Sequence, residues 1–157
     1  MKGTSEDRKA VAVRPAKDDQ YDRFVELIES EAKDYFDRSL KMMGMPVDTF
    51  RKLFRVAGWV YGVYEGRRLA GFCWIELRGD VLHIHGLVLW KEFQGRGIGT
   101  GVLDVLEAEF RGKAKAMEIG VYSFSGRARA FFERHGYSVA RAREDLDFHI
   151  LQKPLPA

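Results

Sequence analysis

The sequence predicts an α+β fold in a single domain that spans residues 1–157. Three strand-like runs between Trp59 and Leu89 are separated by glycine-containing turns, which predicts an antiparallel meander. After this meander, segments with helical spacing alternate with strand-like segments, which predicts strand–helix–strand crossovers. The ends of the chain, residues 1–9 and 154–157, are expected to be flexible.

The N-terminal third is expected to supply one strand and two helices. Residues 11–13 are strand-like, and Asp18 or Asp19 can cap the first helix. Residues 35–57 are rich in methionine and aromatic side chains, and the clearest element there is a short helix after Pro46.

The rest of the chain is expected to form six strands and two helices. In order, these are strands at 59–64, 69–77 and 81–89, a helix that ends near 111, a strand at 116–122, a helix at 126–135, and strands at 137–140 and 147–152. This order is typical of α+β domains whose sheet is mixed but mostly antiparallel.

Composition narrows the class of protein. With 46% hydrophobic and 31% charged residues, the chain has the composition of a soluble globular protein, and a cytoplasmic location is expected. A net charge of +3 is too small to argue for nucleic-acid binding, and no apolar run is long enough to cross a membrane. The first nine residues are too polar for a signal peptide, and the single cysteine, Cys73, fits a reducing compartment.

Glycines at alternate positions mark the junction between the strand that ends at Leu89 and the next helix. The stretch reads Gln94-Gly95-Arg96-Gly97-Ile98-Gly99. A helix start exposes unpaired N–H groups and the positive end of the helix dipole, and glycines let an anion approach this backbone. The P-loop pattern is absent because no lysine follows, and Thr100 stands where the dinucleotide pattern needs a glycine. We therefore expect a phosphate site of another kind.

The pattern Gln94-x-x-Gly97-x-Gly99 resembles the pyrophosphate-binding loop of the GNAT N-acetyltransferase superfamily, whose members use acetyl-coenzyme A (acetyl-CoA). Residues 128–137, which read Ala-x-x-Phe-Phe-Glu-Arg-His-Gly-Tyr, are similar to the second signature of that superfamily. The resemblance covers residues 82–140. It implies a three-layer fold in which a twisted, mostly antiparallel sheet carries helices on both faces. It also implies that the fourth and fifth strands splay apart and that the pantetheine arm of CoA lies between them.

The resemblance also implies which residues bind acetyl-CoA, with no metal ion. The amides of the glycine loop would hold the pyrophosphate, and the main chain of the preceding strand would pair with pantetheine. The residues expected to contact the cofactor are Leu87, Leu89, Gln94, Gly95, Arg96, Gly97, Ile98, Gly99, Thr100, Ser125, Arg127 and Phe132.

Acetyl transfer to an amine needs a base and a donor for the oxyanion. His83 and His85 lie two apart on a predicted strand, so they should share one face with Leu87 and Leu89. The pair is similar to the His-x-His pair that aralkylamine N-acetyltransferases, a GNAT family, use for proton removal. Two interpretations stay open, a proton relay and a purely structural role. By resemblance, the amide of Leu89 stabilises the oxyanion.

The departing thiolate is the least defined part of the expected mechanism. Phe132 stands where many GNAT enzymes have a tyrosine that protonates the thiolate. Either Tyr122 or a water replaces that acid, or the thiolate leaves without a proton. A thiol pKa of roughly 8.5 makes the last option tolerable.

Three functions are compatible with these residues. The first is acetylation of a small primary amine, and the second is acetylation of a protein or peptide amine. The third is a non-catalytic module that binds acyl-CoA and senses it. Residues 21–57 are expected to form the acceptor site, and a homodimer is compatible with the sequence.

Overall fold

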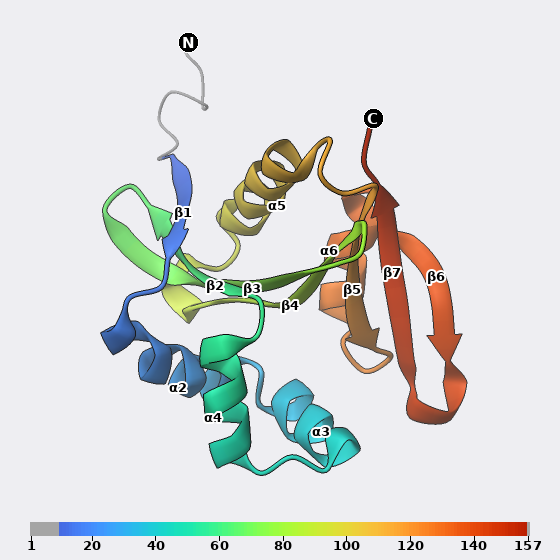
Figure 1. Ribbon diagram of the computed structural model, residues 1–157, viewed down its shortest axis with the longest axis horizontal. Helices are drawn as coiled ribbons and strands as arrows, with labels where there is room; N and C mark the ends of the chain where they lie inside the picture. Colours follow the sequence, from blue (N-terminus) through green and yellow to red (C-terminus); the bar gives the residue numbers. More distant parts are fainter. Residues whose placement is uncertain (1–9, 157) are drawn as a thin grey trace.

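A seven-stranded sheet forms the middle layer of the protein in the computed structural model, which describes residues 10–156 (Figure 1). The strand order is β1-β2-β3-β4-β5-β7-β6, and every neighbouring pair is antiparallel except β4 and β5. The strands are β1 (Val11–Pro15), β2 (Trp59–Glu65), β3 (Arg68–Arg78), β4 (Val81–Leu89), β5 (Ala116–Tyr122), β6 (Ser138–Arg143) and β7 (Phe148–Pro154). The predicted mixed, mostly antiparallel sheet is confirmed.

Helices cover both faces of this sheet, as the sequence predicts. They are α2 (Tyr21–Glu31), α3 (Lys33–Met43), α4 (Val47–Val56), α5 (Ile98–Phe110) and α6 (Gly126–Arg134), with short 3-10 turns at Asp18–Gln20, Lys91–Phe93 and Glu144–Leu146. Figure 1 shows α2, α3 and α4 below the sheet and α5 above it. Each face has its own core: Phe24 and Phe72 belong to the one under α2–α4, and Leu103 and Phe132 to the one under α5 and α6. None of the helices formed by residues 10–156 is long and apolar enough to cross a membrane.

The region between β1 and β2 contains three helices, one more than predicted. Helix α3 begins after a break at Ala32 and ends at Gly44, whose φ of 62° is in the left-handed region. It buries Phe36 and Leu40, and most of its other residues are charged or polar. The ring of Phe36 packs against that of Phe50, with 4.8 Å between the ring centroids. The short apolar stripe explains why the helical spacing of α3 was missed.

The expected flexibility of residues 154–157 is wrong where it can be checked. Pro154 is the last residue of β7, and the N–H of Leu155 donates to the carbonyl of Lys115 at 2.8 Å. The Leu155 side chain is buried in the core under α5. Residues 1–9 and 157 lie outside the described part of the chain.

The two parallel strands separate halfway along their length. β4 pairs with β5 from Val81 to Ile84, opposite Ala116 to Ile119. Both strands continue beyond this point, to Leu89 and Tyr122, without pairing further with each other. The predicted splay between the fourth and fifth strands is therefore confirmed.

Candidate functional site

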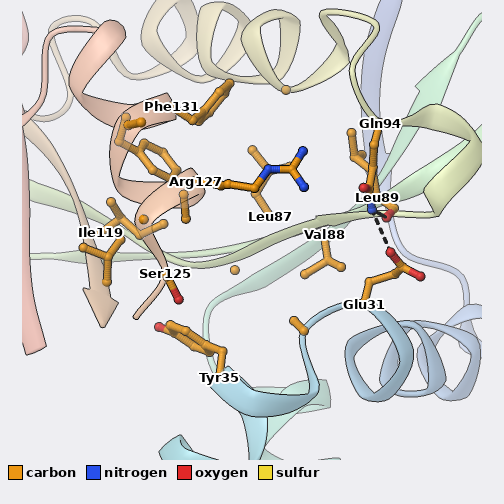
Figure 2. Close-up of a pocket in the computed structure, with 18 of the residues that line it drawn as sticks. Glu31, Tyr35, Leu87, Val88, Leu89, Gln94, Ile119, Ser125, Arg127 and Phe131 are labelled. Carbon is orange, nitrogen blue, oxygen red and sulfur yellow. Dashed lines mark hydrogen bonds between the residues drawn. The ribbon is translucent and has the colours of Figure 1, made fainter. Parts of the chain in front are cut away.

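The gap between β4 and β5 opens into a cleft of about 1290 Å³. Its walls are the ends of the two strands, the start of α5, helix α6 and the α2–α3 junction (Figure 2). Most of the predicted site residues line it: His85, Leu87, Leu89, Gln94, Gly95, Gly97, Ile98, Gly99, Thr100, Ser125, Arg127 and Phe132. His83, Arg96 and Tyr122 are absent from this lining among the described residues.

The glycine loop leaves the N-terminus of α5 open to the cleft. Gly97 is the N-cap residue with φ 83° and ψ 5°, a conformation that a side chain would strain. No side chain in the described chain caps it, so the first N–H groups of the helix keep their positive dipole unopposed. A Cβ atom at Gly99 would lie 3.1 Å from the ring of Phe131 on α6. The loop therefore combines free N–H groups with close packing of α6.

Three side chains of the loop hold it in place. Ile98 is buried in the core, and Nε2 of Gln94 donates to the carbonyl of Leu89 and to Oε1 of Glu31, both at 2.9 Å. The Gln94–Glu31 bond joins the loop to the end of α2 (Figure 2). The third is Thr100, whose hydroxyl bonds to His135 at the end of α6.

The hydroxyl of Thr100 lies 2.9 Å from Nε2 of His135, at the end of α6. Nδ1 of His135 lies 2.7 Å from the carbonyl oxygen of Phe131, which can only accept a hydrogen bond. Nδ1 therefore carries the proton, and in the neutral ring Nε2 accepts the proton of Thr100. Thr100 is thus left with its amide, more than its hydroxyl, as a donor to an anion.

The two arginines expected at the cofactor differ in direction. Arg96 turns away from the cleft and pairs with the buried carboxylate of Glu65 at 2.7 Å, so the structure does not bring its side chain to the expected phosphate site. Arg127 lies at the start of α6 and points its guanidinium into the cleft (Figure 2). Arg129 bonds instead to His149 at 2.8 Å.

The main chain of β4 turns alternate residues toward the cleft. The N–H of Trp90 donates to the carbonyl of Ala70 at 3.0 Å, which makes these two a hydrogen-bonded pair in the ladder of β3 and β4. Because such pairs alternate with non-bonded ones, Val88 also bonds toward β3. The N–H and C=O groups of Leu87 and Leu89 then point to the opposite edge, which faces the cleft. These groups are free to pair with an extended ligand, apart from the Leu89 carbonyl that accepts from the loop.

A β-bulge interrupts β4 where the cleft begins. Trp74 pairs with Gly86 and Ile75 pairs with Ile84 in the backbone register, so the backbone of His85 has no pairing partner on β3. The bulge shifts the alternation of side chains by one residue, and this shift was not visible in the spacing of the sequence.

The four residues expected on one face of β4 therefore lie on two faces. His83 and His85 face α2–α4, where the ring of His85 packs on Trp74 at 4.4 Å. Leu87 and Leu89 pack against the core under α5. The predicted shared face of all four side chains is wrong because of the bulge.

His85 is the histidine that lines the cleft, and Nε2 of its ring lies 2.8 Å from Oε1 of Glu76 on β3. A carboxylate only accepts hydrogen bonds, so Nε2–H donates and Nδ1 is the basic nitrogen. Burial lowers the pKa of His85, against the opposing effect of the bond to Glu76. That bond is also the main cause of the lowered pKa of the Glu76 carboxyl. The lowered pKa favours the uncharged His85 ring at pH 7, in which Nδ1 can accept a proton.

His83 lies behind His85, with 4.7 Å between the ring centroids. Its Nδ1 is 2.8 Å from Oε2 of Glu118 on β5, the residue opposite it in the parallel pair. Burial lowers the pKa of His83 to about 4, although the bond to Glu118 opposes this shift. Burial also raises the pKa of Glu118, but hydrogen bonds from Gln152 and His83 and the charge of Arg141 outweigh it, so that pKa is lowered. Behind the histidine at the cleft there is thus a second histidine, and behind that a carboxylate.

Sequence reasoning missed Glu118, although a signal was present. It is the one charged residue in the apolar strand β5, and its side chain is only 7% exposed. A buried carboxylate in a strand needs partners, which here are His83 and Gln152.

Tyr122 does not occupy the position expected of an acid. Its ring is 1% exposed, and its hydroxyl lies 3.2 Å from Oγ of Ser39 and 4.0 Å from the sulfur of Met42, both on α3. Tyr35, also on α3, lines the cleft in its place. The sequence places Tyr35 only within a stretch rich in methionine and aromatic side chains, because nothing local shows that α3 reaches the splay.

Comparison with known proteins identifies the family of this chain. The model of the acetyltransferase (GNAT) family matches residues 21–137. The chain therefore belongs to the acetyltransferase (GNAT) family, which confirms the resemblance of its glycine loop and second signature to the GNAT superfamily and the expected class of acyltransferase enzymes. A search of curated proteins gave no match.

Solved structures share the fold at low sequence identity. An acetyltransferase from Thermus thermophilus has a TM-score of 0.70 at 15% identity, with 93% of this chain and 97% of that chain covered. A GNAT acetyltransferase from Elizabethkingia anophelis with acetyl-CoA bound has a TM-score of 0.67 at 16% identity, covering 92% and 98%. The PaiA N-acetyltransferase from Thermoplasma acidophilum in complex with coenzyme A has a TM-score of 0.70 at 12% identity, covering 92% and 99%.

Proposed function

We propose that this protein transfers the acetyl group of acetyl-CoA to a primary amine by direct attack of the amine on the thioester. One observation carries the proposal. A single cleft joins an uncapped helix N-terminus behind a glycine loop to a neutral histidine at the point where β4 and β5 separate. The structures of family relatives that hold acetyl-CoA or CoA support this choice of donor.

The cofactor would bind mainly through backbone groups. The N–H groups between Gly95 and Thr100 suit the pyrophosphate, and the outward main chain of Leu87 and Leu89 suits the amides of pantetheine. Arg127, whose side chain enters the cleft, is placed to meet a phosphate of CoA.

The reaction would use the neutral His85 as base. Its Nδ1 accepts a proton from the amine as the amine nitrogen attacks the acetyl carbon, and the N–H of Leu89 stabilises the oxyanion. His83, whose ring is in direct contact with that of His85 and whose Nδ1 is held by Glu118, is proposed to take part in passing the proton onward. Collapse of the intermediate breaks the C–S bond and releases CoA.

The acceptor is proposed to be an amine on a small molecule or a peptide, bound at the α2–α3 side of the cleft. This side contributes Ser30 to Tyr35 to the lining. The two histidines face the same side, which brings the base to the acceptor.

An amine-panel assay for thiol release, run beside calorimetry with CoA, tests this function. We expect CoA binding and thiol release with at least one amine or peptide. CoA binding without thiol release for any acceptor would favour a module that senses acyl-CoA, and absence of CoA binding would refute the proposal as a whole.

A further inference from the structure

Tyr35 contributes a phenol to the cleft. The two positions considered for the acid that protonates the thiolate, Phe132 and Tyr122, do not. Phe132 lines the cleft but carries no proton, and Tyr122 directs its hydroxyl to Ser39 and Met42. Among the cleft-lining residues between positions 10 and 156, Tyr35 is the one tyrosine.

The hydroxyl of Tyr35 lies at the apex of the splay. It donates to the carbonyl of Gly120 at 3.2 Å, and Gly120 is the first β5 residue beyond the last pair that β5 makes with β4. His85 is the corresponding first residue on β4. In Figure 2 the hydroxyl end of Tyr35 points to the same side of the cleft as Ile119 and Ser125. A proton acceptor on β4 and a proton donor beside β5 therefore border the apex from opposite strands.

The surroundings of Tyr35 keep it a neutral donor. Burial raises the pKa of its phenol, and the nearby Tyr122 adds to the effect. The edge of its ring packs against Tyr122 with centroids 5.1 Å apart, which fixes the direction of the hydroxyl. The bond to a neutral carbonyl at 3.2 Å is long, so a nearby anion would compete well for the same proton.

On the basis of the acetyl transfer proposed above, we propose that Tyr35 stabilises the departing thiolate of CoA by donating a hydrogen bond to its sulfur. When the C–S bond breaks, the electron pair remains on sulfur and the phenol O–H turns from the Gly120 carbonyl to this anion. The thiolate leaves as such and takes its proton from water after release. Such a donor acts most strongly in the transition state, where charge develops on sulfur.

The substitution Tyr35→Phe tests this role and keeps the ring that packs on Tyr122. We expect kcat for the best acceptor of the amine panel to fall about 10- to 100-fold, the range for loss of a hydrogen bond to an ion, with little change in KM for acetyl-CoA. Tyr137→Phe is the matched control, because the buried hydroxyl of Tyr137 has no hydrogen-bond partner in the described chain and lies outside the cleft lining. It should leave kcat unchanged.

A second acetyl donor distinguishes a chemical role of the Tyr35 hydroxyl from a structural one. In an acetyl-CoA analogue whose pantetheine arm carries an electron-withdrawing group near the thiol, the thiol pKa is lower and the thiolate needs less stabilisation. The defect of Tyr35→Phe should shrink severalfold with this donor. A defect of equal size with both donors, or wild-type kcat in Tyr35→Phe, would overturn the proposal.

Two further outcomes are distinguishable. If Tyr122→Phe, and not Tyr35→Phe, shows the defect that depends on the leaving group, the role belongs to Tyr122. If the wild-type protein binds CoA but releases no thiol with any acceptor, the proposed acetyl transfer is overturned and the role of Tyr35 with it, whereas an active wild type with an equally active Tyr35→Phe overturns the role of Tyr35 alone.

Discussion

The two ends of the cleft are built from different material. At the glycine loop, the groups that face the cleft are backbone N–H groups of one short segment, from Gly95 to Thr100. At the apex they are side chains from two elements, His85 from β4, which is held by Glu76 of β3, and Tyr35 from α3. A backbone site depends on local conformation, whereas a side-chain site depends on how distant segments pack. The first should be sensitive to backbone strain and the second to the loss of single functional groups.

The largest effect is expected from Gly97→Val, which should abolish CoA binding, with at least a 100-fold loss of affinity by calorimetry. A β-branched residue at φ 83° would force the loop out of shape and cover its N–H groups. Gly112→Val is a matched control, because Gly112 has the same φ of 83° and equally open space but lies outside the cleft. Both variants should lose stability, by about 1–2 kcal/mol. If both bind CoA as the wild type does, the loop is not the phosphate site.

His85→Gln should lower kcat about 100-fold at neutral pH, the usual scale of general base catalysis. Since the neutral ring is the active form, the wild-type rate should fall as the pH drops through a pKa that burial holds below 6.5, and this acid limb should vanish in the variant. His83→Gln, one step further from the cleft, should cost less. Equal losses from both variants would contradict the order of the two histidines, and full activity in both would place the base elsewhere.

Stability should also depend on pH through His83. Its pKa is about 4 in the folded protein against an ordinary 6.5, because burial and the charges of Arg78 and His85 outweigh Glu118. Between these values the unfolded chain binds a proton that the folded protein does not, so the stability falls as the pH is lowered. Between pH 7 and 4.5, urea unfolding should show a loss about 2 kcal/mol larger in the wild type than in His83→Gln. An identical loss would mean that His83 titrates normally.

The smallest expected effect is a difference in CoA affinity between substitutions of the two arginines near the glycine loop, Arg127 and Arg96. Arg127→Ala should weaken CoA binding about 5-fold, as expected for one partly solvated charge pair. Arg96→Ala should change the affinity less than about 2-fold, because its guanidinium is held by Glu65. Calorimetry at low and moderate salt would check both, and the reverse ranking would show that Arg96 leaves Glu65 when CoA binds.

Much of the fold and the glycine-loop end of the cleft could be predicted from the sequence, because their signals are local. Alternating apolar residues located the strands, and the spacing from Gln94 to Gly99 located an open helix start. Helix α3 was missed because its buried stripe consists of little more than Phe36 and Leu40.

The apex could be predicted only in part. His85 could be identified from its position in the strand. The prediction that it shares a face with Leu87 and Leu89 is wrong, because the bulge arises from pairing with β3. Glu118 and Tyr35 come from elements whose distance from the histidines is set by strand order and by the packing of α3. Long-range register of this kind has no counterpart in residue spacing, so these partners could be identified only in three dimensions.

The bulge at His85 has a consequence for the kinetic order of the proposed reaction. It lets β4 present its histidines to one face of the sheet while Leu87 and Leu89 pack on the other. An amine and a thioester can then reach the same point from opposite sides and occupy the protein together. Because both substrates can be bound at the same time, the reaction needs no covalent acetyl-enzyme intermediate. Initial rates measured over a grid of both substrate concentrations should accordingly give intersecting lines in a double-reciprocal plot, where a covalent acetyl-enzyme would give parallel ones.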